Sequence, residues 1–165
     1  IDLGDKYMPL QGAEIVRTMV EDMGRYGRKN GKGFYDYDTK PKTLWKGLSD
    51  LAPVTINDST PELVEDQKRR LLYRQAVEVA KCWEEGVIDD PREADVGAIL
   101  GWGFAPWTGG PITYIDQIGL KAFVEQADKY AAQYGDRFTP PQLLRDMAAK
   151  GETFYGNFEG KKAAA

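Results

Sequence analysis

Residues 120–135 read LKAFVEQADKYAAQYG and carry the strongest repeating pattern in the chain. Apolar side chains recur there at intervals of three and four residues, and the set is Leu120, Phe123, Val124, Ala127, Tyr130, Ala131 and Tyr134. This spacing places them on one face of an α-helix, and Gly135 is a residue at which such a helix commonly ends. The stretch therefore predicts an amphipathic helix over 120–134 whose apolar face needs another surface to cover it.

Helical spacing and N-terminal capping signals predict further helices on both sides of this stretch. Ser59-Thr60-Pro61-Glu62 and Asp90-Pro91-Arg92-Glu93 have the form of capping boxes with proline in the first turn. Thr139-Pro140 is expected to cap the last helix, which Gly151 closes. The helix after Ser59 would be about twice the usual length, so a break is expected within 67–70. The other predicted helices cover 12–23, 91–100 and a short segment from Pro111.

No part of the sequence alternates apolar and polar residues for long enough to indicate a half-buried strand. A glycine-rich turn is expected at 24–33, followed by a short extended aromatic piece at 34–37. Residues 38–59 are expected to form a connector with one short helix. The predicted fold class is all-α.

Composition and charge exclude several classes of function. The chain has 165 residues, and its 22 Lys and Arg against 26 Asp and Glu give a formal net charge of -4, which provides no general attraction to nucleic acid or anionic membrane. The chain has no histidine, so it holds no His general base, no Ser-His or Cys-His pair and no Cys/His zinc site. No apolar run approaches the roughly 20 residues that span a bilayer, so no transmembrane segment is predicted.

The single cysteine, Cys82, and the first residues indicate the cellular context. One cysteine excludes an intrachain disulfide, and no cluster of carboxylates completes a calcium loop, so no metal site is predicted. The neighbours Val79, Ala80 and Trp83 predict a buried or half-buried thiol. The N-terminal residues lack the features of a signal peptide, so a reducing, cytoplasmic location is expected. The chain does not begin with Met, and we expect it to be part of a longer polypeptide.

The segment GRYGRKNGKG at 24–33 is the candidate ligand site. Its glycines allow backbone N–H groups to converge on an anion, and it adds four cations, Arg25, Arg28, Lys29 and Lys32. It does not fit a P-loop, because Tyr26 replaces a required glycine and Gly33 stands where a magnesium-binding hydroxyl belongs. A tight turn with solvated cations is the favoured interpretation, and anion binding is the alternative.

The segment GWGFAPWTGG at 101–110 begins like a dinucleotide fingerprint, but Pro106 replaces the third glycine. Its aromatic rings suit stacking on a flat ligand or packing within the protein. The favoured interpretation is that Trp102, Phe104 and Trp107 fill the corner between packed helices.

The two glycine-rich segments, taken together, resemble a known family. GRYGRKNGKGFYDY at 24–37 is similar to the segment that closes a helical repeat in 3-hydroxyacyl-CoA dehydrogenases. EEGVI at 84–88, EAD at 93–95, GWGFAPWTGGP at 101–111 and YID at 114–116 are similar, in order and spacing, to the last helical repeat of the multifunctional fatty-acid β-oxidation enzymes. The likeness spans about residues 12–155.

The resemblance implies a part in the NAD-dependent oxidation of 3-hydroxyacyl-CoA to 3-oxoacyl-CoA. In that family NAD sits on an upstream Rossmann domain, and a His-Glu pair on that domain takes the substrate proton. Neither the glycine fingerprint nor any histidine is present here, and Arg69-Arg70 stands where the first repeat of the family has an Asn-Arg pair. The resemblance therefore assigns no catalytic and no cofactor-binding residue to this chain.

The resemblance also implies an organisation and a set of partners. Residues 1–38 would form the end of a first helical repeat, and residues 39–60 would connect it to a second repeat at 61–160. Residues 161–165 would form a disordered tail. The second repeat would stand in for the partner subunit of dimeric relatives, a structural role without activity of its own. The implied partners are the upstream Rossmann domain and first repeat of the same polypeptide, the acyl-CoA substrate, and a thiolase subunit.

An independent helical binding module is the alternative hypothesis, with the basic loop recognising a partner or an acyl-CoA. Under the leading hypothesis, ten side chains are predicted to lie in the core or in a contact between repeats. They are Leu71, Leu72, Val79, Trp83, Ile99, Phe104, Trp107, Ile115, Phe123 and Val124.

Overall fold

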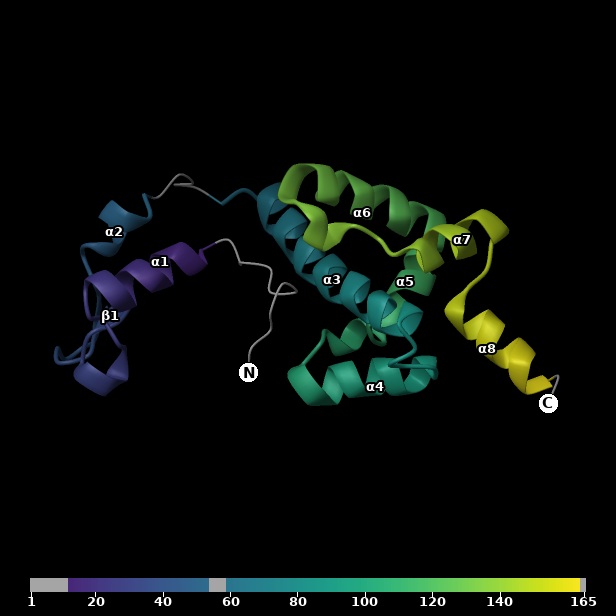
Figure 1. Ribbon diagram of the computed structural model, residues 1–165, viewed down its shortest axis with the longest axis horizontal. Helices are drawn as coiled ribbons and strands as arrows, with labels where there is room; N and C mark the ends of the chain where they lie inside the picture. Colours follow the sequence, from purple (N-terminus) through teal and green to yellow (C-terminus); the bar gives the residue numbers. More distant parts are fainter. Residues whose placement is uncertain (1–11, 54–58, 164–165) are drawn as a thin grey trace. The chain divides into compact units, whose positions relative to one another are not determined.

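The computed structural model describes residues 12–53 and 59–163, which form two compact units with their boundary between Ser59 and Thr60. The first helix in the described part of the N-terminal unit is α1, Ala13–Arg17, which continues directly into a π-helical turn, η2, at Thr18–Asp22 (Figure 1). Met19 is the only apolar side chain among the unit's described residues that is buried. The predicted helix over 12–23 is confirmed, with a widened last turn.

The other described residues of the N-terminal unit form a small hairpin followed by one short helix. A 3-10 turn, η3 at Arg28–Asn30, leads into β1, Tyr35–Asp36, which pairs antiparallel with β2, Thr43–Leu44. The short helix expected in the connector is α2, Leu48–Leu51. The extended piece expected at 34–37 is confirmed at residues 35–36 only, and β2 is a pairing partner that the sequence did not predict.

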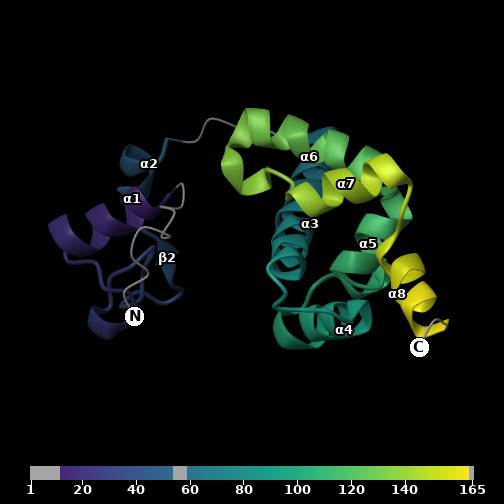
Figure 2. The ribbon, with the colours of Figure 1, turned by 45° about the vertical axis from the view of Figure 1, so that its right-hand side comes forward.

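The C-terminal unit is a bundle of six helices among its described residues, all labelled in Figure 2. Its elements, in chain order, are α3, Pro61–Glu84; α4, Pro91–Trp102; η4, Pro106–Thr108; α5, Pro111–Ile118; α6, Leu120–Tyr134; η5, Asp136–Phe138; α7, Gln142–Lys150; and α8, Phe154–Ala163. Helix α7 packs against α6, α5 contacts α3, α4 and α6, and α8 contacts α4 and α5. The all-α fold class is confirmed.

The core of the C-terminal unit is built on aromatic side chains from α3 and α6. The rings of Tyr73 and Phe123 stack with their centres 4.3 Å apart, and Tyr130 meets Tyr73 edge-on at 5.4 Å. The hydroxyl of Tyr130 donates to Asp66 at 3.0 Å, and burial raises the pKa of Tyr130 to about 12. The apolar face predicted for 120–134 is thus covered by helices of the same unit, and Leu144 of α7 belongs to the same core.

Several predicted boundaries need correction. Helix α3 is continuous, without the break expected at 67–70, and an ion pair between Arg70 and Asp66 one turn earlier spans that segment. The hydroxyl of Thr60, one residue after the predicted cap, accepts from the backbone N of Leu63 at 3.2 Å. Pro141 precedes α7 and offers no side-chain cap, so Thr139 is not the cap.

Helix α8 was not predicted, because it has no clear apolar stripe. It extends to Ala163 and so includes 161–163, which the sequence placed in a disordered tail. Residues 164–165 lie outside the described part of the chain.

Five of the ten predicted core side chains are buried or nearly so, and three, Leu72, Trp83 and Ile99, are half-buried. The buried five are Val79, Phe104, Ile115, Phe123 and Val124. Leu71 is 66% exposed and Trp107 is 84% exposed, so neither belongs to the core of this unit. Leu71 lies two residues, about 200° of helix turn, from the buried Tyr73, which points it away from the core.

Candidate functional site

The glycine-rich segment folds around Arg25 and forms, with the two strands that follow, a basic hairpin of residues 24–46. Nε of Arg25 donates to the carbonyl oxygen of Gly33 at 2.9 Å, and Nη2 donates to Oδ1 of Asp36 at 2.6 Å. The guanidinium lies 4.2 Å from the ring centre of Trp45, a cation–π distance. Only 9% of the Arg25 side chain is exposed, so Arg25 holds the basic hairpin together.

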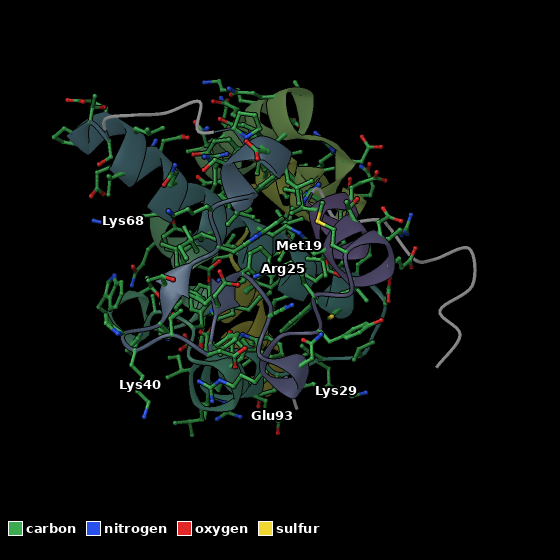
Figure 3. All side chains as sticks on the ribbon, turned by 90° about the vertical axis from the view of Figure 1, so that its left-hand side faces the viewer. Met19, Arg25, Lys29, Lys40, Lys68 and Glu93 are labelled. Carbon is green, nitrogen blue, oxygen red and sulfur yellow. The ribbon has the colours of Figure 1, made fainter. Side chains whose placement is uncertain are left out.

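The four candidate cations are therefore not equivalent. The interpretation of a turn with solvated cations is wrong for Arg25, because Asp36 and the Gly33 carbonyl supply the partners that make burial of a guanidinium favourable. Arg28, Lys29 and Lys32 are exposed, as expected for solvated cations. Figure 3 shows Arg25 inside the unit and Lys29 at its edge.

Close contacts account for two glycines of the basic hairpin, Gly31 and Gly33. Gly31 has a φ of 76°, and a Cβ there would lie 2.5 Å from a carboxylate oxygen of Asp38. Gly33 is buried, and its Cβ would lie 2.8 Å from the Cα of Gly27. Asn30 ties the turn together, since its Nδ2 donates to the Gly24 carbonyl at 2.6 Å. The glycine pattern thus encodes a tight polar turn.

In the C-terminal unit, a buried carboxylate on α4 caps a helix that begins 16 residues later. Oδ1 of Asp95 accepts from the backbone N of Ile112 at 2.7 Å, and Oδ2 accepts from the backbone N and the hydroxyl of Thr113 at 3.1 and 2.5 Å. These backbone groups belong to the first turn of α5, whose N–H groups have no partner within the helix. A Cβ on Gly110 would lie 2.4 Å from Asp95, so only glycine fits there.

A second carboxylate repeats the arrangement at the start of α8. Asp116 on α5 accepts from the backbone N of Phe154 at 3.0 Å and from that of Tyr155 at 3.1 Å. The hydroxyl of Tyr155 then donates to Oδ2 of Asp95 at 2.9 Å, which joins the two caps. Burial raises the pKa of Tyr155, so the phenol remains protonated and able to donate.

We call Asp95, Thr113, Asp116 and Tyr155 the polar clasp, because together they fix α4, α5 and α8 to one another. Sequence reasoning missed it, since its bonds join residues 17 to 60 positions apart. One signal was available: Asp95 lies on the stripe of α4 that also contains Pro91, Ala94 and Ala98, and a carboxylate on a buried stripe needs donors.

An apolar groove of about 670 Å³ lies in the C-terminal unit beside residues 101–110, which we call the aromatic loop. Its walls are Leu71, Leu72, Phe104, Ala105, Pro106, Trp107 and Tyr114, with Glu65, Lys68, Arg69 and Gln75 at the polar rim. Phe104 is 1% exposed, but Trp102 is 70% and Trp107 84% exposed. Of the three aromatic residues predicted to fill a corner between helices, only Phe104 does so, because its backbone N bonds back to the carbonyl of Ala98 and turns the chain inward.

The described residues provide neither a metal site nor an activated thiol. Within 12–53 and 59–163, no three His, Cys, Asp or Glu side chains gather as metal ligands would. Cys82 is half-buried, as expected, and burial raises the pKa of its thiol, with Glu78 and Glu85 adding to the increase. No described helix has both the length and the apolar character needed to cross a membrane.

A dinucleotide cofactor does not fit these residues either. Dinucleotides bind where a parallel strand leads through a glycine-rich turn into a helix. The strands of the described residues, β1 and β2, are two residues each and antiparallel.

Comparison with known proteins places most of the C-terminal unit within one protein family. Residues 68–162 match the family described as 3-hydroxyacyl-CoA dehydrogenase, C-terminal domain. The chain belongs to this family. The match covers the whole polar clasp and the apolar groove apart from Glu65, so these features of the C-terminal unit lie within the 3-hydroxyacyl-CoA dehydrogenase C-terminal domain.

Curated relatives extend the similarity into the N-terminal unit. The chain is 38% identical over 164 residues to a fatty acid oxidation complex subunit alpha of Vibrio parahaemolyticus, and 39% identical over 171 residues to one of Shewanella amazonensis. Each alignment covers 94% of this chain and 23% of the relative. A protein of the same name from Pseudomonas paraeruginosa is 37% identical over 90% of this chain. The chain thus spans about a quarter of the length of the relatives it matches.

Proposed function

We propose that this chain is the C-terminal helical scaffold of an NAD-dependent 3-hydroxyacyl-CoA dehydrogenase of fatty-acid β-oxidation. Membership of the dehydrogenase C-terminal domain family supports the proposal, as do relatives named fatty acid oxidation complex subunit alpha. On this proposal NAD, the His-Glu pair and the first part of the helical repeat lie elsewhere in the polypeptide. The chain itself carries no histidine that could take the substrate proton.

The observation that carries the scaffold role is a set of exposed large apolar side chains on the C-terminal unit. Large apolar side chains are more than half exposed on α3, α4 and η4, and they are Leu71, Val96, Leu100, Trp102 and Trp107. Large exposed apolar areas mark surfaces that another protein segment covers. We infer that the remaining polypeptide covers this face, as expected for the predicted contact residues Leu71 and Trp107.

The reaction would then take place on the upstream NAD-binding domain, and this chain would contribute by holding the neighbouring domain in position. NAD accepts hydride from the substrate carbon when it is bound to the enzyme. The residues of this chain would hold the neighbouring helical domain in place and exclude water from its apolar contact with α3 and α4. A thiolase subunit as a further partner and a cytoplasmic location belong to the same proposal.

A complementation assay tests the scaffold role. The Vibrio parahaemolyticus relative is truncated before the region that this chain matches, and NADH formation from a 3-hydroxyacyl-CoA is measured with and without the chain. We expect no turnover from the chain alone and restored turnover from the mixture. Trp107→Asp and Leu71→Asp should prevent restoration, whereas Lys121→Gln, at an exposed position on α6, should not. Turnover by the isolated chain would overturn the scaffold role.

A further inference from the structure

The basic hairpin carries a local positive charge that the composition of the chain conceals. Residues 24–46 contain seven Lys and Arg side chains and only two carboxylates, although the formal net charge of the chain is -4. One of those carboxylates, Asp36, is paired with the buried Arg25. Among the described residues, no ion pair involves Arg28, Lys29 or Lys32. An excess of unpaired cations therefore faces solvent on this hairpin.

Two tyrosine rings lie between cations on the same hairpin. The guanidinium of Arg28 is 5.8 Å from the ring centre of Tyr37, and Nζ of Lys42 is 4.9 Å from that of Tyr35. The two rings are themselves neighbours, with centres 6.3 Å apart and planes tilted by 57°. Tyr35 lies in β1, and Tyr37 lies in the turn that directly follows this strand. The result is a continuous cation–aromatic row, Arg28, Tyr37, Tyr35 and Lys42.

The backbone beneath this row is fixed by bonds that do not use the row's own side chains. The N of Gly27 donates to the carbonyl of Lys32 at 2.6 Å, and the N of Tyr37 donates to the carbonyl of Gly31 at 2.9 Å. The buried Arg25 adds its bonds to Gly33 and Asp36. The cations and rings are therefore presented on a preorganised support, which lowers the entropy lost when a ligand binds.

We propose that the basic hairpin binds the nucleotide end of coenzyme A, with the phosphates on Arg28, Lys29 and Lys32 and the adenine on the tyrosine rings. A ligand with a flat base and several phosphates pairs with cations and rings at the same time. Two rings accommodate one base rather than a length of single strand, which favours a mononucleotide over a nucleic acid. The choice of coenzyme A among nucleotides rests on the proposed function, in which its thioester is the substrate.

Calorimetric titration of the whole chain tests this assignment. The ligands are coenzyme A, dephospho-coenzyme A, which lacks the 3′-phosphate, and pantetheine, which lacks the nucleotide. We expect affinity to fall in that order, with no measurable binding of pantetheine, and coenzyme A binding to weaken at high salt. Equal binding of pantetheine, absence of coenzyme A binding, or tighter binding of a single-stranded oligonucleotide would each overturn the proposal.

Matched variants locate the site. The pair Arg28→Gln and Lys29→Gln should weaken coenzyme A binding about tenfold, because two charge-assisted contacts to phosphate are lost. Lys121→Gln with Lys129→Gln, an equal loss of charge on exposed residues of α6, should leave binding unchanged. Equal weakening by both pairs would contradict the assignment. Tyr35→Leu, checked for folding by hydrogen exchange, should weaken coenzyme A more than inorganic phosphate.

This outcome is separate from that of the complementation assay. A chain that restores dehydrogenase turnover but does not bind coenzyme A would leave the scaffold role intact and refute the nucleotide site. A chain that binds coenzyme A through the basic hairpin but restores no turnover would refute the scaffold role and leave the nucleotide site intact. That result would support the alternative of an independent binding module.

Discussion

The two units of this chain achieve order by different means. The C-terminal unit buries a continuous apolar core, with Phe123, Ile112 and Leu144 fully enclosed, and adds the polar clasp at its edge. The described part of the N-terminal unit buries one apolar side chain, Met19, and depends on hydrogen bonds around Arg25. Apolar burial contributes most of the free energy of folding, whereas hydrogen bonds contribute modestly but fix geometry. The comparison therefore predicts that the C-terminal unit is a stable scaffold, and that the order of the N-terminal unit is local and depends on its hydrogen bonds.

Removal of a core ring should have the largest effect. Phe123→Ala deletes a fully buried ring stacked on Tyr73, and we expect a loss of about 3–5 kcal/mol in the unfolding free energy of the C-terminal unit. Urea titration measures the loss, and hydrogen exchange should show unchanged protection in the basic hairpin. Leu100→Ala, at a position 80% exposed, should change stability by less than about 0.5 kcal/mol. Loss of protection in both units would contradict the expectation that the N-terminal unit is ordered independently of the C-terminal core.

The polar clasp should have the next largest effect. Asp95→Ala leaves the backbone N–H groups of Ile112 and Thr113 without their acceptor, so we expect a loss of about 2–3 kcal/mol. Tyr155→Phe removes a single hydroxyl donor and should cost about 1 kcal/mol. Hydrogen exchange should show α8 opening in both variants. Equal destabilisation by the two substitutions would mean that the carboxylate does not act as a helix cap.

The buried arginine of the N-terminal unit should have a smaller and more local effect. Arg25→Leu removes the bonds to Gly33 and Asp36, and we expect a loss of about 1–2 kcal/mol confined to the basic hairpin. Exchange of the backbone amides of 27–37 should accelerate while the C-terminal unit keeps its protection. Arg28→Leu, which removes an exposed cation, serves as the control and should leave exchange unchanged. Unaltered exchange in Arg25→Leu would show that the hairpin is held by its backbone alone.

The pH dependence of the clasp should be the smallest effect. Burial raises the pKa of Asp116 above its ordinary value of 3.8, so the folded state binds this proton more tightly than the unfolded state. This group therefore makes the free energy of unfolding fall as the pH rises from below 3.8 through the raised value. The stability of Asp116→Asn relative to the original chain should accordingly increase across that range. Urea titrations at several acidic pH values measure the difference, and an opposite slope would contradict the direction of the shift.

Local sequence signals were sufficient for most of the helices. The apolar spacing of 120–134 and the capping boxes that begin at Asp90 and Ser59 predicted α6, α4 and α3, because these signals act within one or two turns. They failed at α8, which is fixed from outside by Asp116. They also failed at Leu71 and Trp107, where apolar character indicated burial but not which surface provides it.

The candidate site was predicted only in part for the same reason. The sequence identified the basic segment and its four cations, yet only the fold separates the buried Arg25 from the exposed Arg28, Lys29 and Lys32. Lys42 approaches Tyr35 because β1 pairs with β2, and no local pattern in the sequence predicted that pairing.

The amino-acid sequence by itself determined the all-α class, the absence of an imidazole for proton transfer, and the segments that carry the family likeness. These depend on residue identity and on spacing along one helix. The tertiary structure decided which polar groups are buried, because a carboxylate such as Asp95 is stable inside a protein only where distant N–H and O–H groups converge on it. That convergence is a property of packed helices, and it exists only once α4, α5 and α8 have come together.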